Sequence, residues 1–341
     1  MQKKYTAVIS SLFLMGLLSA APARATDAAR PGSLNYVEGQ ISIGNQNLDA
    51  KSIGSVELQP GESLATGAGK AELLLTPGVF FRIGDNSVAR IISPRLTDTE
   101  VELTHGAANV EVTEIHPQNF LRVIEDGRST ELVKNGLYDF DADRDRMRVF
   151  DGQAIVQDGN RQVKVKGGQE VDFTMEPLQA RKFDKKSLEM TDLYRWTSLR
   201  SSYLAEANAD AAGTYVGGGP GWYGGGWYWD PWFDAYTFIP GDGIFYSPFG
   251  WGFYSPGFVV EAPIFVRGHY FHRFGRDYQA WGPGRHYGMP NHFGRGVRYG
   301  ARGPAAGFPG GAGSRGFSGG GFRGGAGFHG GGGFHGGGGH R

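Results

Sequence analysis

The feature that most constrains the fold is an alternation of apolar and polar side chains that runs from Tyr36 to Phe173. Successive side chains of a β-strand point to opposite faces, so a period of two is typical of half-buried strands. Val79, Phe81 and Ile83, for example, would share one face of a strand. About a dozen segments of this kind follow one another.

Glycine-containing turns separate these segments at short intervals, among them Pro77-Gly78, Asn135-Gly136 and Asp151-Gly152. Short strands joined by such turns predict an all-β domain over residues 36–175. The expected architecture is a β-sandwich or a rolled β-solenoid of about a dozen short strands.

A strand, a glycine and a second strand recur in Val37–Ile43, Thr104–Val110 and Phe150–Val156. Repeats that bury a shared face predict stacked β units. Chance similarity among the hairpins of an ordinary β domain is the alternative.

Three runs in this region resemble the FecR domain: Leu58–Gly67 with its Thr-Gly turn, Gly69–Gly78 with an Ala-x-Leu-x-Leu strand, and Arg82–Ser87. The resemblance covers residues 36–173 and implies a periplasmic β-rich domain for sensing or scaffolding. Its motifs are structural, so it implies no catalytic residue. FecR-type regulators carry a cytoplasmic anti-sigma segment and a membrane helix before this domain. Here an export signal stands in their place, so the chain more closely resembles stand-alone exported FecR-domain proteins.

The N-terminus has the pattern of that signal. Lys3 and Lys4 precede an apolar run over Ala7–Ala21, and the small-residue motif Ala23-Arg24-Ala25 follows. The run is shorter than the roughly 20 apolar residues of a membrane span. We therefore expect cleavage after Ala25, a linker over 26–35, and a mature protein in the periplasm, outside the cell or on its surface, with no membrane span.

A helical period replaces the strand period over 184–212. Asp184 or Ser187 could cap this helix. The residues expected on its apolar face, spaced three or four apart, are Leu193, Trp196, Leu199, Tyr203 and Ala207. We expect Trp196 and its neighbours to pack on the β domain; a partner-binding helix is the alternative.

The C-terminal part of the chain is much richer in glycine than the part before it, since 41 of the 58 glycines lie in residues 213–341. Residues 213–300 also hold many aromatic side chains, which predicts a largely irregular segment that wraps the β domain. Exposed rings that stack against sugars are the alternative. Residues 301–341 contain little beyond Gly, Phe, Arg, Ala and His, and the entropy cost of ordering them predicts a disordered tail.

Two motifs have the outline of a ligand site but lack its essential parts. Asp139, Asp141, Asp143 and Asp145 alternate as in a calcium loop, but Arg and Phe stand where an EF-hand needs Gly and Glu. The stretch Gly219–Gly224 fits a dinucleotide fingerprint, but no strand is expected before it. We interpret the first as an acidic turn and the second as a consequence of composition.

The tail offers one weak metal site and one weak nucleic-acid motif. His329, His335 and His340 lie in glycine-rich repeats that would bind a metal ion only weakly. Arg315-Gly316-Phe317 and Arg323-Gly324-Gly325 resemble RNA-binding segments, but export would remove that partner. We therefore assign no catalytic, cofactor-binding or metal-binding residue.

The function predicted from the sequence is non-enzymatic binding or scaffolding in the cell envelope or extracellular matrix. An absence of cysteine excludes disulfides, thiolate metal sites and a cysteine nucleophile. The expected partner is an envelope or matrix polymer or an envelope protein, not nucleic acid. A periplasmic ligand sensor that acts through a separate membrane partner is one alternative, and a polysaccharide hydrolase is another.

Overall fold

The computed structural model describes residues 29–262. These residues all lie in the first of the two units into which the chain divides, Met1–Gln279. The expected signal peptide and the expected disordered tail lie outside the described residues.

Fifteen strands form one sheet, which confirms the all-β prediction. Its strands are β1 (Leu34–Ile43), β2 (Gln46–Leu48), β3 (Ser63–Leu74), β4 (Val79–Ile83), β5 (Val88–Arg95), β6 (Asp98–His105), β7 (Ala107–Val112), β8 (Phe120–Glu125), β9 (Arg128–Leu132), β10 (Gly136–Asp141), β11 (Arg146–Asp151), β12 (Gln153–Asp158), β13 (Arg161–Lys166), β14 (Gln169–Asp172) and β15 (Arg181–Lys182). A 3₁₀ turn, η1 (Ala50–Ser52), follows β2.

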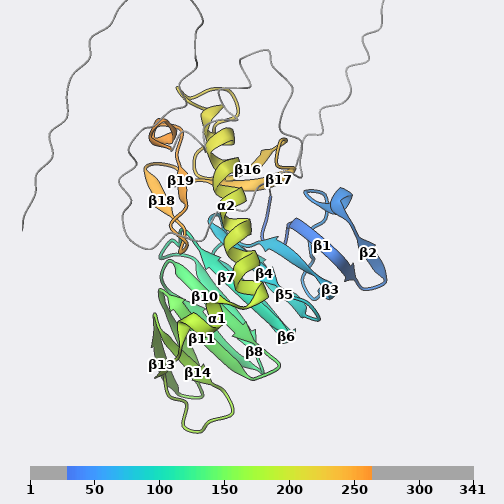
Figure 1. Ribbon diagram of the computed structural model, residues 1–341, viewed down its shortest axis with the longest axis vertical. Coiled ribbons are helices and arrows are strands. Elements are labelled where there is room, and N and C mark those ends of the chain that lie inside the picture. Colours follow the sequence, from blue (N-terminus) through green and yellow to red (C-terminus); the bar gives the residue numbers. More distant parts are fainter. Residues whose placement is uncertain (1–28, 263–341) are drawn as a thin grey trace, which may run out of the picture. The chain divides into compact units, whose positions relative to one another are not determined.

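The sheet divides into two halves at its longest strand, β3. The strand order is β13-β12-β9-β8-β6-β5-β3-β4-β7-β10-β11-β14-β15, and β1 pairs with β2 and β3. The start of β3 pairs with β5 and its end with β4. Apolar side chains of both halves, such as Val101 and Val123 from one and Val110 and Val149 from the other, meet in a single core. The sheet is therefore rolled around that core (Figure 1).

Glycines of the sequence repeat mark the places where the chain passes from one half to the other. Gly106 joins β6 to β7 and Gly152 joins β11 to β12, with φ of 77° and 96°. A Cβ on Gly152 would lie 2.4 Å from the hydroxyl oxygen of Tyr138 and one on Gly106 would lie 2.2 Å from Oγ of Ser87. Only glycine combines this backbone conformation with this close approach. The repeat thus marks the corners of one rolled sheet.

Two helices occupy the region where one was expected. They are α1 (Lys185–Glu189), whose first turn is capped by Asp184, and α2 (Asp192–Gly213). The α2 helix crosses the outer face of β4 and β7 (Figure 1). No helix within residues 29–262 is long and apolar enough to cross a membrane.

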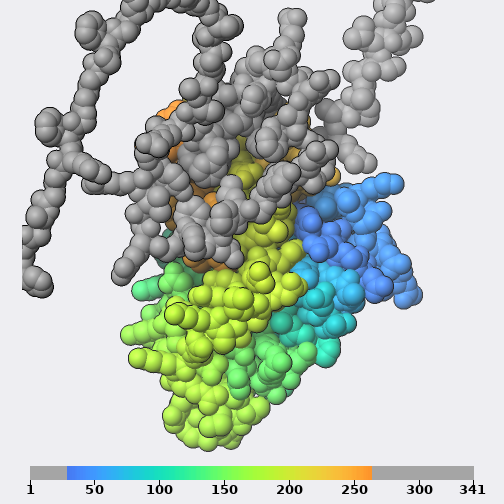
Figure 2. Space-filling model, viewed as in Figure 1, coloured from blue at the N-terminus to red at the C-terminus, as the bar shows by residue number. Residues whose placement is uncertain are grey.

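The buried face of α2 is more polar than its sequence indicates. Trp196 packs on Tyr36 with a ring-centroid distance of 5.9 Å, as expected. In the space-filling view, the first turns of α2 lie at the surface beside β1 and β3 (Figure 2). Leu199, expected on the apolar face, is half exposed, whereas Thr197 and Arg200 are buried. The reason is that the strands beneath α2 present charged side chains to it.

The first part of the aromatic segment contains more regular structure than we expected. It forms two hairpins, β16 (Gly226–Asp230) with β17 (Ala235–Ile239) and β18 (Ile244–Tyr246) with β19 (Gly252–Tyr254), and ends in η2 (Val259–Glu261). Rings from both hairpins pack with Leu204 of α2 and Phe80 of β4 in a second apolar cluster.

Candidate functional site

A buried ion network fixes α2 to the outer face of the sheet. Glu72, Arg82 and Glu111 lie on the neighbouring strands β3, β4 and β7 and are fully buried. Nε of Arg82 lies 2.6 Å from Glu72 Oε2, and Nη1 of Arg82 contacts Glu111. From α2, Arg200 Nη2 lies 2.9 Å from Glu72 Oε1, and Ser201 Oγ donates to Glu111 Oε1 at 2.7 Å.

The network is balanced in charge, with two guanidinium groups against two carboxylates. Burial alone would raise the pKa of Glu72, but Arg200 and Arg82 outweigh it and hold that pKa below its ordinary value. Burial likewise opposes the charge of Arg82, and Glu111 and Glu72 outweigh it and raise its pKa. Both charged states are therefore the stable ones inside the protein. The arrangement is suited to holding α2 in place.

Two asparagine side chains attach the aromatic hairpins to α2 and to the sheet. Asn208 of α2 donates to the carbonyl oxygens of Phe238 and Tyr254 at 2.8 and 3.0 Å and accepts from Tyr254 N at 2.7 Å. Asn35 of β1 donates to the Tyr236 carbonyl oxygen at 3.0 Å and accepts from its N–H at 2.7 Å. These buried amides pair with backbone as a neighbouring strand would. The hairpins are thereby joined to both α2 and the β domain.

Three rings at the start of the aromatic segment form a stack. Tyr228 lies between Trp222 and Tyr223, with centroid distances of 5.4 and 4.7 Å and interplanar angles of 18° and 17°. Tyr215 packs at a tilt against Trp222 and Tyr228. Tyr228 is buried, whereas Tyr223 is 67% exposed. The segment thus combines buried rings, as a wrap would, with an ordered exposed ring.

Other large side chains are exposed on the same segment, including Trp232 at 48% and Tyr246 at 61%. Between residues 214 and 262 the chain has no Lys, Arg or His and four acidic residues. A surface of aromatic rings without positive charge is suited to contacts with uncharged partners.

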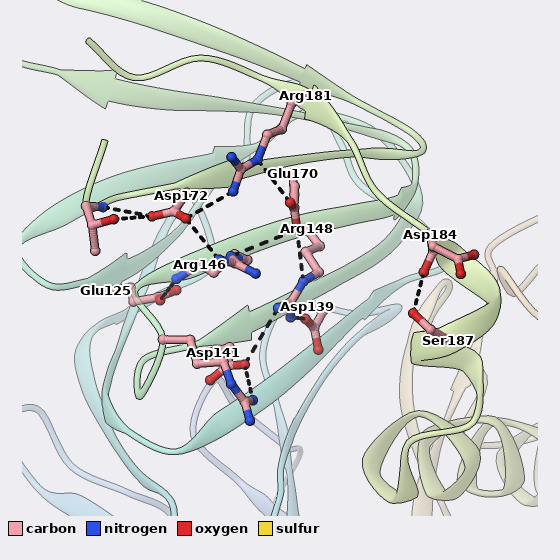
Figure 3. A network of polar contacts seen from close by, with 12 residues as sticks. Glu125, Asp139, Asp141, Arg146, Arg148, Glu170, Asp172, Arg181, Asp184 and Ser187 are labelled. Atoms are coloured by element: carbon pink, nitrogen blue, oxygen red, sulfur yellow. Dashed lines mark hydrogen bonds and ion pairs between the residues drawn. The ribbon is translucent and has the colours of Figure 1, made fainter. Parts of the chain in front are cut away.

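A second polar network covers strands β10, β11, β14 and β15 (Figure 3). Direct cross-strand partners of opposite charge build it, an arrangement that stabilises a sheet. The pairs are Arg148 with Asp139 and Glu170, Arg146 with Asp172, and Arg181 with Glu170 and Asp172. Because each of these carboxylates already contacts an arginine, the network resembles a structural ladder more than an acid–base pair.

Glu125, at the end of β8, differs from these carboxylates. It is fully buried, its Oε1 accepts the Arg146 N–H at 3.0 Å, and its Oε2 has no hydrogen-bond partner within the described part of the chain. Burial raises the pKa of Glu125 to about 9; the Arg146 N–H opposes the shift, and nearby aspartates add to it. Glu125 is therefore protonated at neutral pH.

The four alternating aspartates interpreted as an acidic turn lie at the β10–β11 hairpin. Asp139 and Asp141 contact Arg148, and Asp141 also contacts Arg144 at 2.9 Å. Asp143 Oδ1 accepts the Gly106 N–H at 2.8 Å, next to a sheet corner. Over residues 29–262 no group of three metal-ligating side chains could hold an ion.

The remaining sequence motifs fall in different places. The stretch Gly219–Gly224 lies between α2 and β16, so a helix precedes it and a strand follows, the reverse of a dinucleotide-binding loop. The three tail histidines and the Arg-Gly motifs lie outside the described residues.

Sequence reasoning missed the buried network, although the FecR-like motif contains its central residue, Arg82. The available signal was a cation inside the apolar run Val79–Ile83.

Comparison with known proteins gives no family assignment. No protein-family model matches the chain, and no curated protein matches it. Two similar crystal structures are of "a putative anti-sigma factor" from Parabacteroides distasonis, each 12% identical, with TM-scores of 0.33 and 0.32. They cover 37% and 40% of this chain, which spans 62% and 64% of theirs. Likeness at this level assigns no function.

Proposed function

We propose that this chain is an exported, non-enzymatic binding protein of the cell envelope or extracellular matrix, built on a FecR-like β domain. One observation carries the proposal: the aromatic hairpins are fixed to the β domain through α2, yet they leave ordered rings exposed. The signal-like N-terminus and the FecR-like motifs of the sequence support it. The rings would contact a polymer of the envelope or matrix, while the β domain serves as the rigid base.

Binding to isolated envelopes tests this proposal. We expect the mature protein, residues 26–341, to cosediment with cell envelopes, peptidoglycan or exopolysaccharide. A double variant, Tyr223→Ser with Tyr246→Ser, should bind at least about fivefold more weakly, because loss of one or two ring contacts removes about 1 to 3 kcal/mol. Leu96→Ser is the control, since Leu96 is an exposed apolar residue of the β5–β6 turn. Equal binding by all three proteins would contradict the proposal.

The FecR-like motifs also favour a second function, a periplasmic sensor that acts through a separate membrane protein. Crosslinking in intact cells distinguishes the polymer-binding function from the sensor function. Recovery of one membrane protein in stoichiometric amount, with no retention on polymers, would favour the sensor.

A further inference from the structure

We infer that Tyr223 is a stacking platform for the sugar rings of an uncharged polysaccharide. This inference rests on the proposed binding function and names its ligand class. It is carried by the ring stack, by the bonds that hold the exposed ring, and by the charge of the surrounding segment.

The Tyr223 ring has one face covered and most of its remaining surface in contact with solvent. Its covered face stacks on Tyr228 at a centroid distance of 4.7 Å and an angle of 17°. With 67% of the residue exposed, the opposite face is open. A flat, open ring of this kind matches the apolar C–H face of a pyranose.

Hydrogen bonds hold the ring in this position. The Tyr223 hydroxyl donates to the Trp227 carbonyl oxygen at 3.0 Å, and the Tyr223 N–H donates to the Tyr228 hydroxyl at 3.3 Å. The Tyr228 hydroxyl in turn donates to the Gly224 carbonyl oxygen at 2.6 Å. An aromatic ring fixed before binding loses little side-chain entropy when a ligand stacks on it.

The loop around the ring lacks side chains that would cover it. Gly221 and Gly224 flank the Trp222-Tyr223 pair, and a Cβ built on Gly224 would meet no atom within 4 Å. This open space beside the ring admits a bulky polymer chain.

Charge selects among polymers. Residues 214–262 include Asp230, Asp234, Asp242 and Glu261 but no basic side chain. Polyanions such as nucleic acids and polyuronates bind through Lys and Arg, and an acidic segment repels them. A neutral polysaccharide meets no such repulsion and gains the stacking contact.

Affinity for chosen polymers tests the inference with the mature full chain. The neutral probes are cellulose, chitin and a β-1,3-glucan, and the anionic probe is polygalacturonate. We expect binding to at least one neutral probe, with a Kd raised at least about tenfold by Tyr223→Ala and changed less than about threefold by Tyr223→Trp. Phe120→Ala is the matched control, because Phe120 is also an exposed aromatic residue, at 51%, but lies on β8 outside the aromatic segment and has no ring stacked on it among the described residues. Unchanged thermal unfolding of each variant excludes loss of the fold.

Each outcome decides the inference. Neutral binding that depends on Tyr223 and not on Phe120 supports it. Binding to polygalacturonate alone, neutral binding that survives Tyr223→Ala, or no binding to any neutral probe overturns it. If the protein then still binds isolated envelopes, the proposed function stands; if it binds neither, both fall.

Discussion

Replacing Arg82 with methionine should lower the free energy of unfolding by about 3 to 5 kcal/mol, as is typical when one partner of a buried ion pair is removed. Arg82 is fully buried and contacts both Glu72 and Glu111. Without it, Glu111 keeps only the Ser201 hydroxyl as a side-chain partner among the described residues. Urea unfolding of the mature protein at pH 7 measures the change.

Two variants show whether the buried charge causes this loss. Adding Glu111→Gln to Arg82→Met removes the one carboxylate left without a cation, because Glu72 keeps its ion pair with Arg200. This double variant should recover part of the lost stability. Arg90→Met is the surface control, because Arg90 also pairs with a glutamate, Glu102, but is 41% exposed. We expect that variant to cost less than about 1 kcal/mol. If the two arginine variants proved equally stable, the network would have no special role.

The second large effect is a gain in stability. Folded Glu125 has a pKa of about 9, above the ordinary value near 4.5, so the folded protein holds a proton that the unfolded chain releases. Below the ordinary pKa, Glu125 is protonated in both the folded and the unfolded protein, so it does not lower the free energy of unfolding. As the pH rises from the ordinary pKa toward 9, the unfavourable contribution of Glu125 to folding grows by about 1.4 kcal/mol per pH unit. Glu125→Gln should therefore stabilise the protein by about 1 kcal/mol or less at pH 5 and by about 3 to 5 kcal/mol at pH 8.

Thermal and urea unfolding at pH 5 and pH 8 measure this difference. Asp172→Asn is the control. Hydrogen bonds from Thr174 and the nearby Arg146 outweigh burial and lower the pKa of Asp172 to about 2. Its contribution to stability is complete above the ordinary pKa and is lost only in acid. The effect of Asp172→Asn should thus be the same at both pH values. A Glu125→Gln effect that is also independent of pH would mean that Glu125 is ionised in the folded protein.

The inward face of the sheet could be predicted from the sequence, but the outward face could not. Val79, Phe81 and Ile83 of β4 lie in the core as the alternation indicates, yet Phe80 and Arg82 between them are also buried. Alternation shows which residues share a face and not what covers the other face. Because α2 follows β4 by about a hundred residues, no local pattern connects them.

The same limit applies to α2 and to the aromatic hairpins. Leu199 has the right spacing for the buried face of α2 but is half exposed. Arg200 and Ser201 are buried in its place, because they bind Glu72 and Glu111 on the strands beneath. In the glycine-rich hairpins, strands β17 and β19 are held by Asn208 and Asn35. These asparagines are far in sequence from the backbone groups of Phe238, Tyr254 and Tyr236 that they bind. The glycine repeat was visible, but its meaning as sheet corners depended on which strands pair.

Buried contacts join the β domain, α2 and the aromatic hairpins in one folded unit. Native-state hydrogen exchange on the mature protein tests it most directly, with the amides of β16, β17 and β19 compared against those of β7. We predict that the hairpin amides Tyr228, Phe238 and Tyr254 are protected and that Arg82→Met weakens their protection together with that of α2. Hairpin amides that exchange as fast as an unstructured peptide, while β7 stays protected, would contradict the claim.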